Sequence, residues 1–123
     1  MQHTDRTEYR SDLHQRQKEL MLGWYDRLAE SANTGAPPAV SMMGSGACVE
    51  LIEAFDMLPL YPEVNALQLA IRRQSLEPIL AAEEFGYASD NCAYVKADIG
   101  AYLRGITPTG GPLPKPALVL CNF

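Results

Sequence analysis

Three cysteines, Cys48, Cys92 and Cys121, are the side chains of this sequence best suited to chemistry. Their odd number, in a chain whose N-terminus carries no export signal, argues against a disulfide framework. They lie far apart and form no C-x-x-C pair, so their spacing matches neither a zinc ribbon nor a ferredoxin. Buried apolar thiols, a reactive thiol and metal ligands therefore remain as alternatives.

Cys92 has the surroundings that most favour a thiolate. Ser89 or Asp90 can cap a helix that runs from about residue 91 to Arg104, which places Cys92 in the first turn. Unpaired backbone N–H groups and the helix dipole stabilise negative charge there, and Lys96 can add to this effect. Because the thiolate is the form that binds metal, Cys92 is the first candidate ligand, with an ordinary core thiol as the alternative.

Cys48 repeats this arrangement, because it follows an apolar run and the glycine turn "GSG" at the start of another helix. Cys121 lies at the end of the last apolar run. In an open parallel sheet the helix starts and the strand ends share one edge, so the three cysteines could converge. The glycine turn lacks the lysine of a phosphate-binding P-loop, and we interpret it as a tight turn only.

The elements that position these cysteines follow from apolar periodicity and from glycine and proline. Residues 9–32 are expected to form one long helix, with a single apolar stripe, that ends before Pro37 and Pro38. Beyond it, the runs 39–43, 58–62 and 117–123 are typical of strands, the last of them a buried one.

Helices are expected between these strands, over residues 48–57 and 63–85, as well as at Cys92. Pro78 divides the second of these regions, because proline fits the first turn of a helix that begins after Ser75 and ends at Gly86. Alternating strands and helices predict an α/β fold: a partial Rossmann-like (flavodoxin-like) domain with parallel strands, preceded by a long N-terminal helix.

Two segments are expected: an N-terminal helical segment over residues 1–35, and the N-terminal part of a Rossmann-like α/β domain over residues 36–123. A parallel sheet rarely stops directly after a central apolar strand, so we expect a longer protein than these 123 residues.

Composition excludes several function classes. Ten Lys and Arg against fifteen Asp and Glu give a net charge of −5, which disfavours nonspecific nucleic-acid binding. No apolar run approaches the roughly 20 residues of a membrane span, and the polar N-terminus cannot be the core of a signal peptide. We therefore expect a cytoplasmic protein that binds neither nucleic acid nor membrane.

Three stretches, "ELIEAFDMLPLYPEVNALQLAIRRQS", "DNCAYVKADIGAYLRG" and "GPLPKPALVLCNF", resemble the benzoyl-CoA reductase and 2-hydroxyacyl-CoA dehydratase family, most of all its reductase branch. The resemblance runs in order from about His14 to the end of the chain. It implies a subunit that pairs with a homologous sister subunit and receives single electrons from an ATP-hydrolysing iron–sulfur activator. The substrate would be an acyl-CoA, either benzoyl-CoA, whose ring is dearomatised in anaerobic aromatic degradation, or a 2-hydroxyacyl-CoA, which is dehydrated through a radical.

The resemblance also implies a 4Fe-4S cluster whose ligands this chain shares with residues outside it. Cys92 matches the family's cysteine in "CAYVK" and is the first ligand expected; Cys48 is the second, and Cys121 is not assigned. A non-catalytic α/β interaction module, with ordinary core thiols, is the alternative from a different functional class.

Overall fold

The structure is a computed structural model that describes residues 3–43 and 48–121, with side chains from residue 11 onward. The predicted glycine turn at 44–47 and the last two residues lie outside the described part. The helices within it are α1 (His3–Thr34), α2 (Val49–Ala54), α3 (Pro62–Ile71), α4 (Leu76–Phe85) and α5 (Ala93–Arg104), and the strands are β1 (Ala39–Met43), β2 (Leu58–Leu60) and β3 (Leu118–Cys121).

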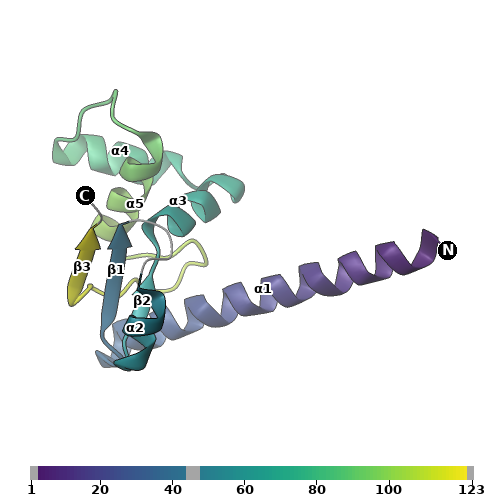
Figure 1. The fold of residues 1–123 in the computed structure, drawn as a ribbon. Helices are drawn as coiled ribbons and strands as arrows, with labels where there is room; N and C mark the ends of the chain where they lie inside the picture. The colour runs from purple at the N-terminus through teal and green to yellow at the C-terminus, as the bar shows by residue number, and fades with distance from the viewer. Residues whose placement is uncertain (1–2, 44–47, 122–123) are drawn as a thin grey trace.

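The three strands form one parallel sheet in the order β2-β1-β3. The chain leaves β1 through α2 to reach β2, and then returns through α3, α4 and α5 to β3 on the other side of β1 (Figure 1). This confirms the predicted α/β fold and the long N-terminal helix. It also makes the carboxyl end of β1 the point where the strand order reverses, which is where open parallel sheets bind ligands.

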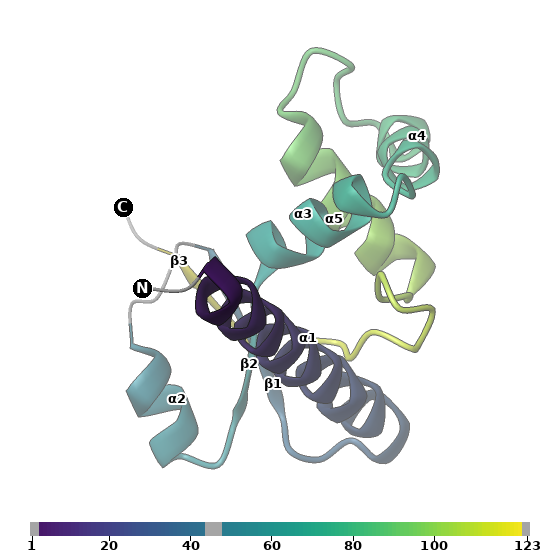
Figure 2. The same ribbon diagram turned by 90° about the vertical axis from the view of Figure 1, so that its right-hand side faces the viewer.

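Helices cover both faces of the sheet: α2 lies on one side and α1 on the other (Figure 2). Tyr25 and Leu28 of α1 pack in one buried cluster with Leu58 and Leu60 of β2. On the opposite side, Ile52 of α2 packs against β1. These contacts hold the sheet through apolar burial, the main favourable term in folding.

The helices α3, α4 and α5 lie beyond the carboxyl ends of the strands (Figure 1). A small-residue core, made of Ala66 and Leu69 of α3 with Ala97 and Ala101 of α5, joins α3 to α5. Between α4 and α5 the approach is closer still, because a Cβ atom on Gly100 would lie 1.8 Å from the carbonyl oxygen of Pro78. Only glycine leaves room for this crossing.

The glycine and proline punctuation is confirmed, but one cap prediction is wrong. Pro78 is the third residue of α4, while Gly86 and Gly105 end α4 and α5 with positive φ angles of 120° and 65°. Helix α5, however, begins at Ala93, so Cys92 itself is the N-cap residue in place of Ser89 or Asp90. The thiol therefore precedes the first turn, and residues 86–92 form a loop.

The prediction of a buried last strand is also wrong. Leu118 and Val119 of β3 are 49% and 53% exposed, although their sequence is as apolar as that of buried β1. The reason is topological: β3 is an edge strand that pairs only with β1 among the described residues. None of the described helices combines the length and the apolar character needed to cross a membrane.

Candidate functional site

A cavity of about 630 Å³ opens at the carboxyl end of β1, between the first turns of α3 and α5. Its wall is mainly apolar, with a thiol and two carboxyl groups among it. The lining residues are Met42, Met43, Pro62, Glu63, Leu67, Cys92, Tyr94, Val95, Asp98 and Ile99. This is the edge of the sheet at which the sequence predicted a site.

Cys92 is exposed and lines this cavity. Its sulfur forms no cap hydrogen bond, but it lies close enough to two backbone N–H groups for them to lower the pKa of the thiol. The N–H group of Val95 has the larger effect and that of Tyr94 the smaller one. Slight desolvation opposes this shift, and the charge of Lys96 adds a smaller lowering. The predicted tendency toward a thiolate is thus present, and its main source is the start of the helix rather than the lysine.

Lys96 has a different main partner from the one the sequence suggested. Its buried ammonium lies 2.6 Å from Oε1 of Glu83 on α4 and 2.5 Å from the carbonyl oxygen of Ser89. The side chain therefore ties the loop before Cys92 to both α4 and α5. Because a buried ammonium needs such partners, Lys96 positions the loop that carries the thiol.

The polar side chains Tyr25, Asn65 and Asp98 connect α1 to the cavity, and the sequence analysis missed them. The hydroxyl of Tyr25 donates to Oδ1 of Asn65 at 3.2 Å, and Nδ2 of Asn65 donates to Oδ1 of Asp98 at 3.4 Å. Burial raises the pKa of Asp98, while the hydrogen bond from Asn65 partly opposes that rise. In the sequence, the only sign of this connection was that Asn65 and Asp98 each interrupt a run of apolar residues in a predicted helix.

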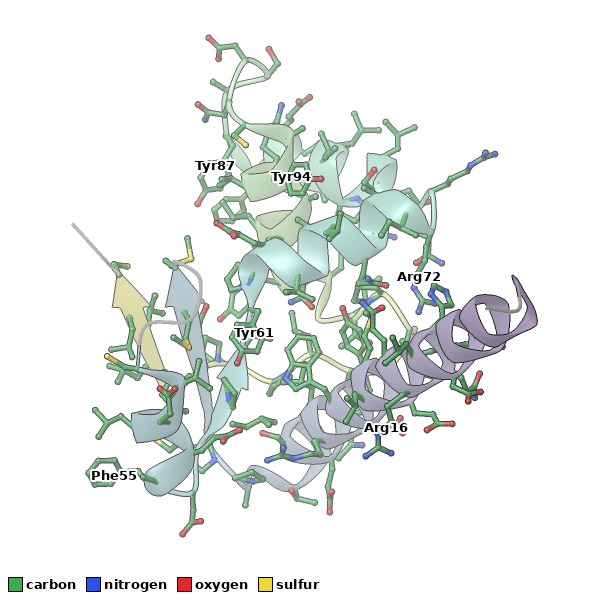
Figure 3. The ribbon with its side chains drawn as sticks, turned by 45° about the vertical axis from the view of Figure 1, so that its right-hand side comes forward. Arg16, Phe55, Tyr61, Arg72, Tyr87 and Tyr94 are labelled. Atoms are coloured by element: carbon green, nitrogen blue, oxygen red, sulfur yellow. The ribbon has the colours of Figure 1, made fainter. Side chains whose placement is uncertain are left out.

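Burial also raises the pKa of the Tyr25 hydroxyl, so this group stays a neutral donor. The nearby charges of Arg72 and Asp98 have smaller and opposite effects on it. Arg72 extends from the end of α3 toward α1, as Figure 3 shows. Asn65 therefore keeps its amide group directed at Asp98, because Tyr25 occupies its oxygen.

The other two cysteines are not among the described residues that line the cavity. Cys48 is exposed at the N-cap of α2, with a left-handed backbone (φ 69°). Cys121 is exposed at the end of β3 and pairs in register with Met43, a residue of the cavity wall. Over residues 11–43 and 48–121, whose side chains the structure describes, no three His, Cys, Asp or Glu side chains are grouped so that they could hold a metal ion. Convergence of the three cysteines into one metal-binding group is therefore not observed there.

Comparison with known proteins relates this chain to one family. The chain is 44% identical over 109 residues to a subunit of the benzoyl-CoA reductase of Thauera aromatica, an alignment that covers 88% of the chain and 25% of that protein. It is 38% identical over 76 residues to the (R)-2-hydroxyisocaproyl-CoA dehydratase alpha subunit of Clostridioides difficile, covering 58% of the chain and 17% of the relative. The chain thus spans a quarter or less of the length of each relative.

The family model described as 2-hydroxyglutaryl-CoA dehydratase, D-component, matches residues 45–123. This match includes β2, β3, the helices α2–α5 and all three cysteines. The chain belongs to this 2-hydroxyacyl-CoA dehydratase and benzoyl-CoA reductase family.

Proposed function

We propose that this chain is part of a subunit of an ATP-dependent, iron–sulfur benzoyl-CoA reductase. The observation that carries the proposal is the exposed Cys92 thiol, whose pKa is lowered at the start of α5, in a cavity at the switch point of the sheet. The 44% identity to a benzoyl-CoA reductase polypeptide supports the choice of substrate.

Cys92 fits the role of one ligand to a 4Fe-4S cluster. An accessible sulfur with thiolate character is what such a cluster requires. When bound, the cluster would relay single electrons to an acyl group. Cys48 is the second candidate ligand in this chain, and the remaining ligands would come from residues outside it.

The cavity wall would hold the acyl group and keep water from it. Met42, Met43 and Leu67 offer an apolar surface that suits an aromatic ring better than a charged one. Asp98 and Glu63 place two carboxyl groups at the same wall. The partners would be a homologous sister subunit, which completes the site, and an ATP-hydrolysing iron–sulfur activator.

A dehydratase acting on a 2-hydroxyacyl-CoA is the second candidate function. The family model and the Clostridioides difficile relative both carry dehydratase names, and this favours it. The same cavity and the same cysteine would serve, with a different acyl group.

The test uses the full-length protein, purified anaerobically with its sister subunit and supplied with activator and ATP. We expect iron and sulfide in a ratio typical of a 4Fe-4S cluster, their loss in Cys92→Ser, and turnover of benzoyl-CoA. Turnover of 2-hydroxyacyl-CoA alone would replace the reductase with the dehydratase. If the parent assembly contained no iron and Cys92→Ser behaved like it, a non-catalytic interaction module would remain.

A further inference from the structure

Beyond the cysteine, the cavity contains a carboxyl group that is held from behind by buried polar residues. Asp98 lines the cavity and is only partly exposed, while Asn65 and Tyr25 behind it are each 1% exposed. The two hydrogen bonds run in one direction, from the Tyr25 hydroxyl through the Asn65 amide to the carboxyl oxygen. Two polar residues at such depth are costly unless they are satisfied, and here each satisfies the next.

We propose that Asp98 is the residue that exchanges protons with the acyl group in this cavity, and that Asn65, fixed by Tyr25, is its positioning residue. This inference rests on the proposed function, because it assumes that an acyl-CoA occupies the cavity.

The surroundings of Asp98 support proton exchange. Burial raises the pKa of its carboxyl group, which brings it nearer to the range in which a group can both give and take a proton. The other titratable groups at this cavity are Glu63 from α3, and Cys92 and Tyr94 at the start of α5; β1 contributes only methionines. No ion pair among the described residues involves Asp98, so no cation holds it permanently as a carboxylate.

Either acyl-CoA reaction requires a proton donor beside the acyl group, and Asp98 can supply that proton. In a ring reduction, each electron from the activator has to be matched by one proton at the acyl group; in a dehydration, the leaving hydroxyl needs a proton to depart as water. In both, the O–H bond of Asp98 breaks as the new bond forms, and the resulting carboxylate accepts the hydrogen bond from Asn65. After the product has left, the carboxylate takes up one proton from the bulk solvent, which restores the acid.

A spectroscopic experiment tests the protonation of Asp98 without relying on turnover. Infrared spectra of the full assembly are recorded across pH for the parent, Asp98→Asn and, as a matched control in the exposed loop before α5, Asp90→Asn. We expect a protonated-carboxyl band that persists above the usual aspartate pKa of about 3.9 and that disappears only in Asp98→Asn. If Asp98→Asn removes no such band, the proposal is overturned.

Turnover then tests the role. Asp98→Asn should lower turnover of the thioester by about 100-fold or more, with iron content unchanged, and Asp98→Glu should recover part of it. Tyr25→Phe frees the Asn65 amide, which weakens the donor to the carboxylate and should move the basic limb of the pH profile upward. A merely structural role would lower turnover without moving that limb. Parent-like turnover and pH profile in Asp98→Asn would overturn the proposal while the cluster function stands; an assembly without iron removes the proposed function, and this inference with it.

Discussion

At the scale of single residues, the chemistry of this chain depends on where one sulfur lies relative to a helix start. Cys92 is the N-cap of α5, so its sulfur faces the N–H groups of the first turn rather than joining that turn. Serine, threonine, aspartate and asparagine usually occupy such a position. A cysteine at this position replaces the capping oxygen with a sulfur that can ionise and bind metal.

The lowered pKa of Cys92 predicts how its alkylation depends on pH. We expect the iodoacetamide reaction at Cys92 in the folded chain to reach half its maximal rate at a lower pH than in the same chain unfolded in urea. The physical reason is that the Val95 and Tyr94 N–H groups stabilise the thiolate only in the folded chain. Mass spectrometry of the peptide containing Cys92 measures this, and identical midpoints in both states would contradict it.

Lys96 gives a prediction for stability, because its ammonium is 2.6 Å from Glu83 and has almost no contact with water. Lys96→Met should lower the free energy of unfolding by about 1–3 kcal/mol, since it leaves a partly buried carboxylate and the Ser89 carbonyl without their donor. The matched control is Arg104→Met on the same helix, which breaks the exposed ion pair with Glu77 and should cost about 0–1 kcal/mol. Urea titration compares the two, and equal losses would show that burial does not matter at Lys96.

At the scale of elements, the crossing of α4 and α5 supports the loop that ends at Cys92, because Lys96 of α5 contacts both Glu83 of α4 and Ser89 of that loop. Gly100→Ala should destabilise the chain by about 1–3 kcal/mol or more, since the new methyl group meets the Pro78 backbone, which cannot move aside without shifting α4. Gly23→Ala in α1 is the control: nothing lies within 4 Å of its Cβ position, so it should stabilise by about 0.5–1 kcal/mol. Thermal unfolding of both variants measures the contrast, and a stable Gly100→Ala chain would mean that the helices can separate at little cost.

The elements themselves could be predicted from the sequence because glycine and proline act locally. Pro78 and Gly86 bound α4, and Gly105 ends α5, through backbone restrictions that need no tertiary contact. The parallel sheet also followed from the alternation of strands and helices. The position of Cys92 was predicted to within one turn, and the shift to the N-cap is within the uncertainty with which helix starts can be predicted.

The parts that could not be predicted depend on contacts between distant segments. Asn65 meets Tyr25 and Asp98 only after three helices have packed, and no local pattern encodes that meeting. Lys96 was expected to stabilise the thiolate of Cys92, because the two residues are four positions apart in one predicted helix. The structure instead gives it Glu83 on another helix. The exposure of β3 could likewise not be predicted, since an apolar run does not show whether its strand lies at the edge or in the middle of the sheet.

At the scale of the whole molecule, the two edges of the sheet differ in how far other parts of the chain cover them. On the β2 side, Pro59 has no N–H to offer, and its carbonyl oxygen accepts a hydrogen bond from Nε1 of Trp24 at 2.9 Å. Helix α1 therefore blocks that edge, both by packing and by hydrogen bonding. On the β3 side, Leu118 and Val119 point to opposite faces and both are about half exposed.

An open apolar edge is a template for further strand pairing, so β3 should dominate how this 123-residue chain associates by itself. We expect the chain to self-associate at micromolar concentration, and Val119→Lys to suppress this, because a charge on an edge strand opposes pairing with another strand. Leu13→Lys is the control, since Leu13 on α1 is equally exposed at 52% but lies on a helix whose backbone groups are paired internally. Sedimentation velocity distinguishes the variants. Equal association of both would place the contact on the apolar surface in general, and loss of association only in Leu13→Lys would place it on α1.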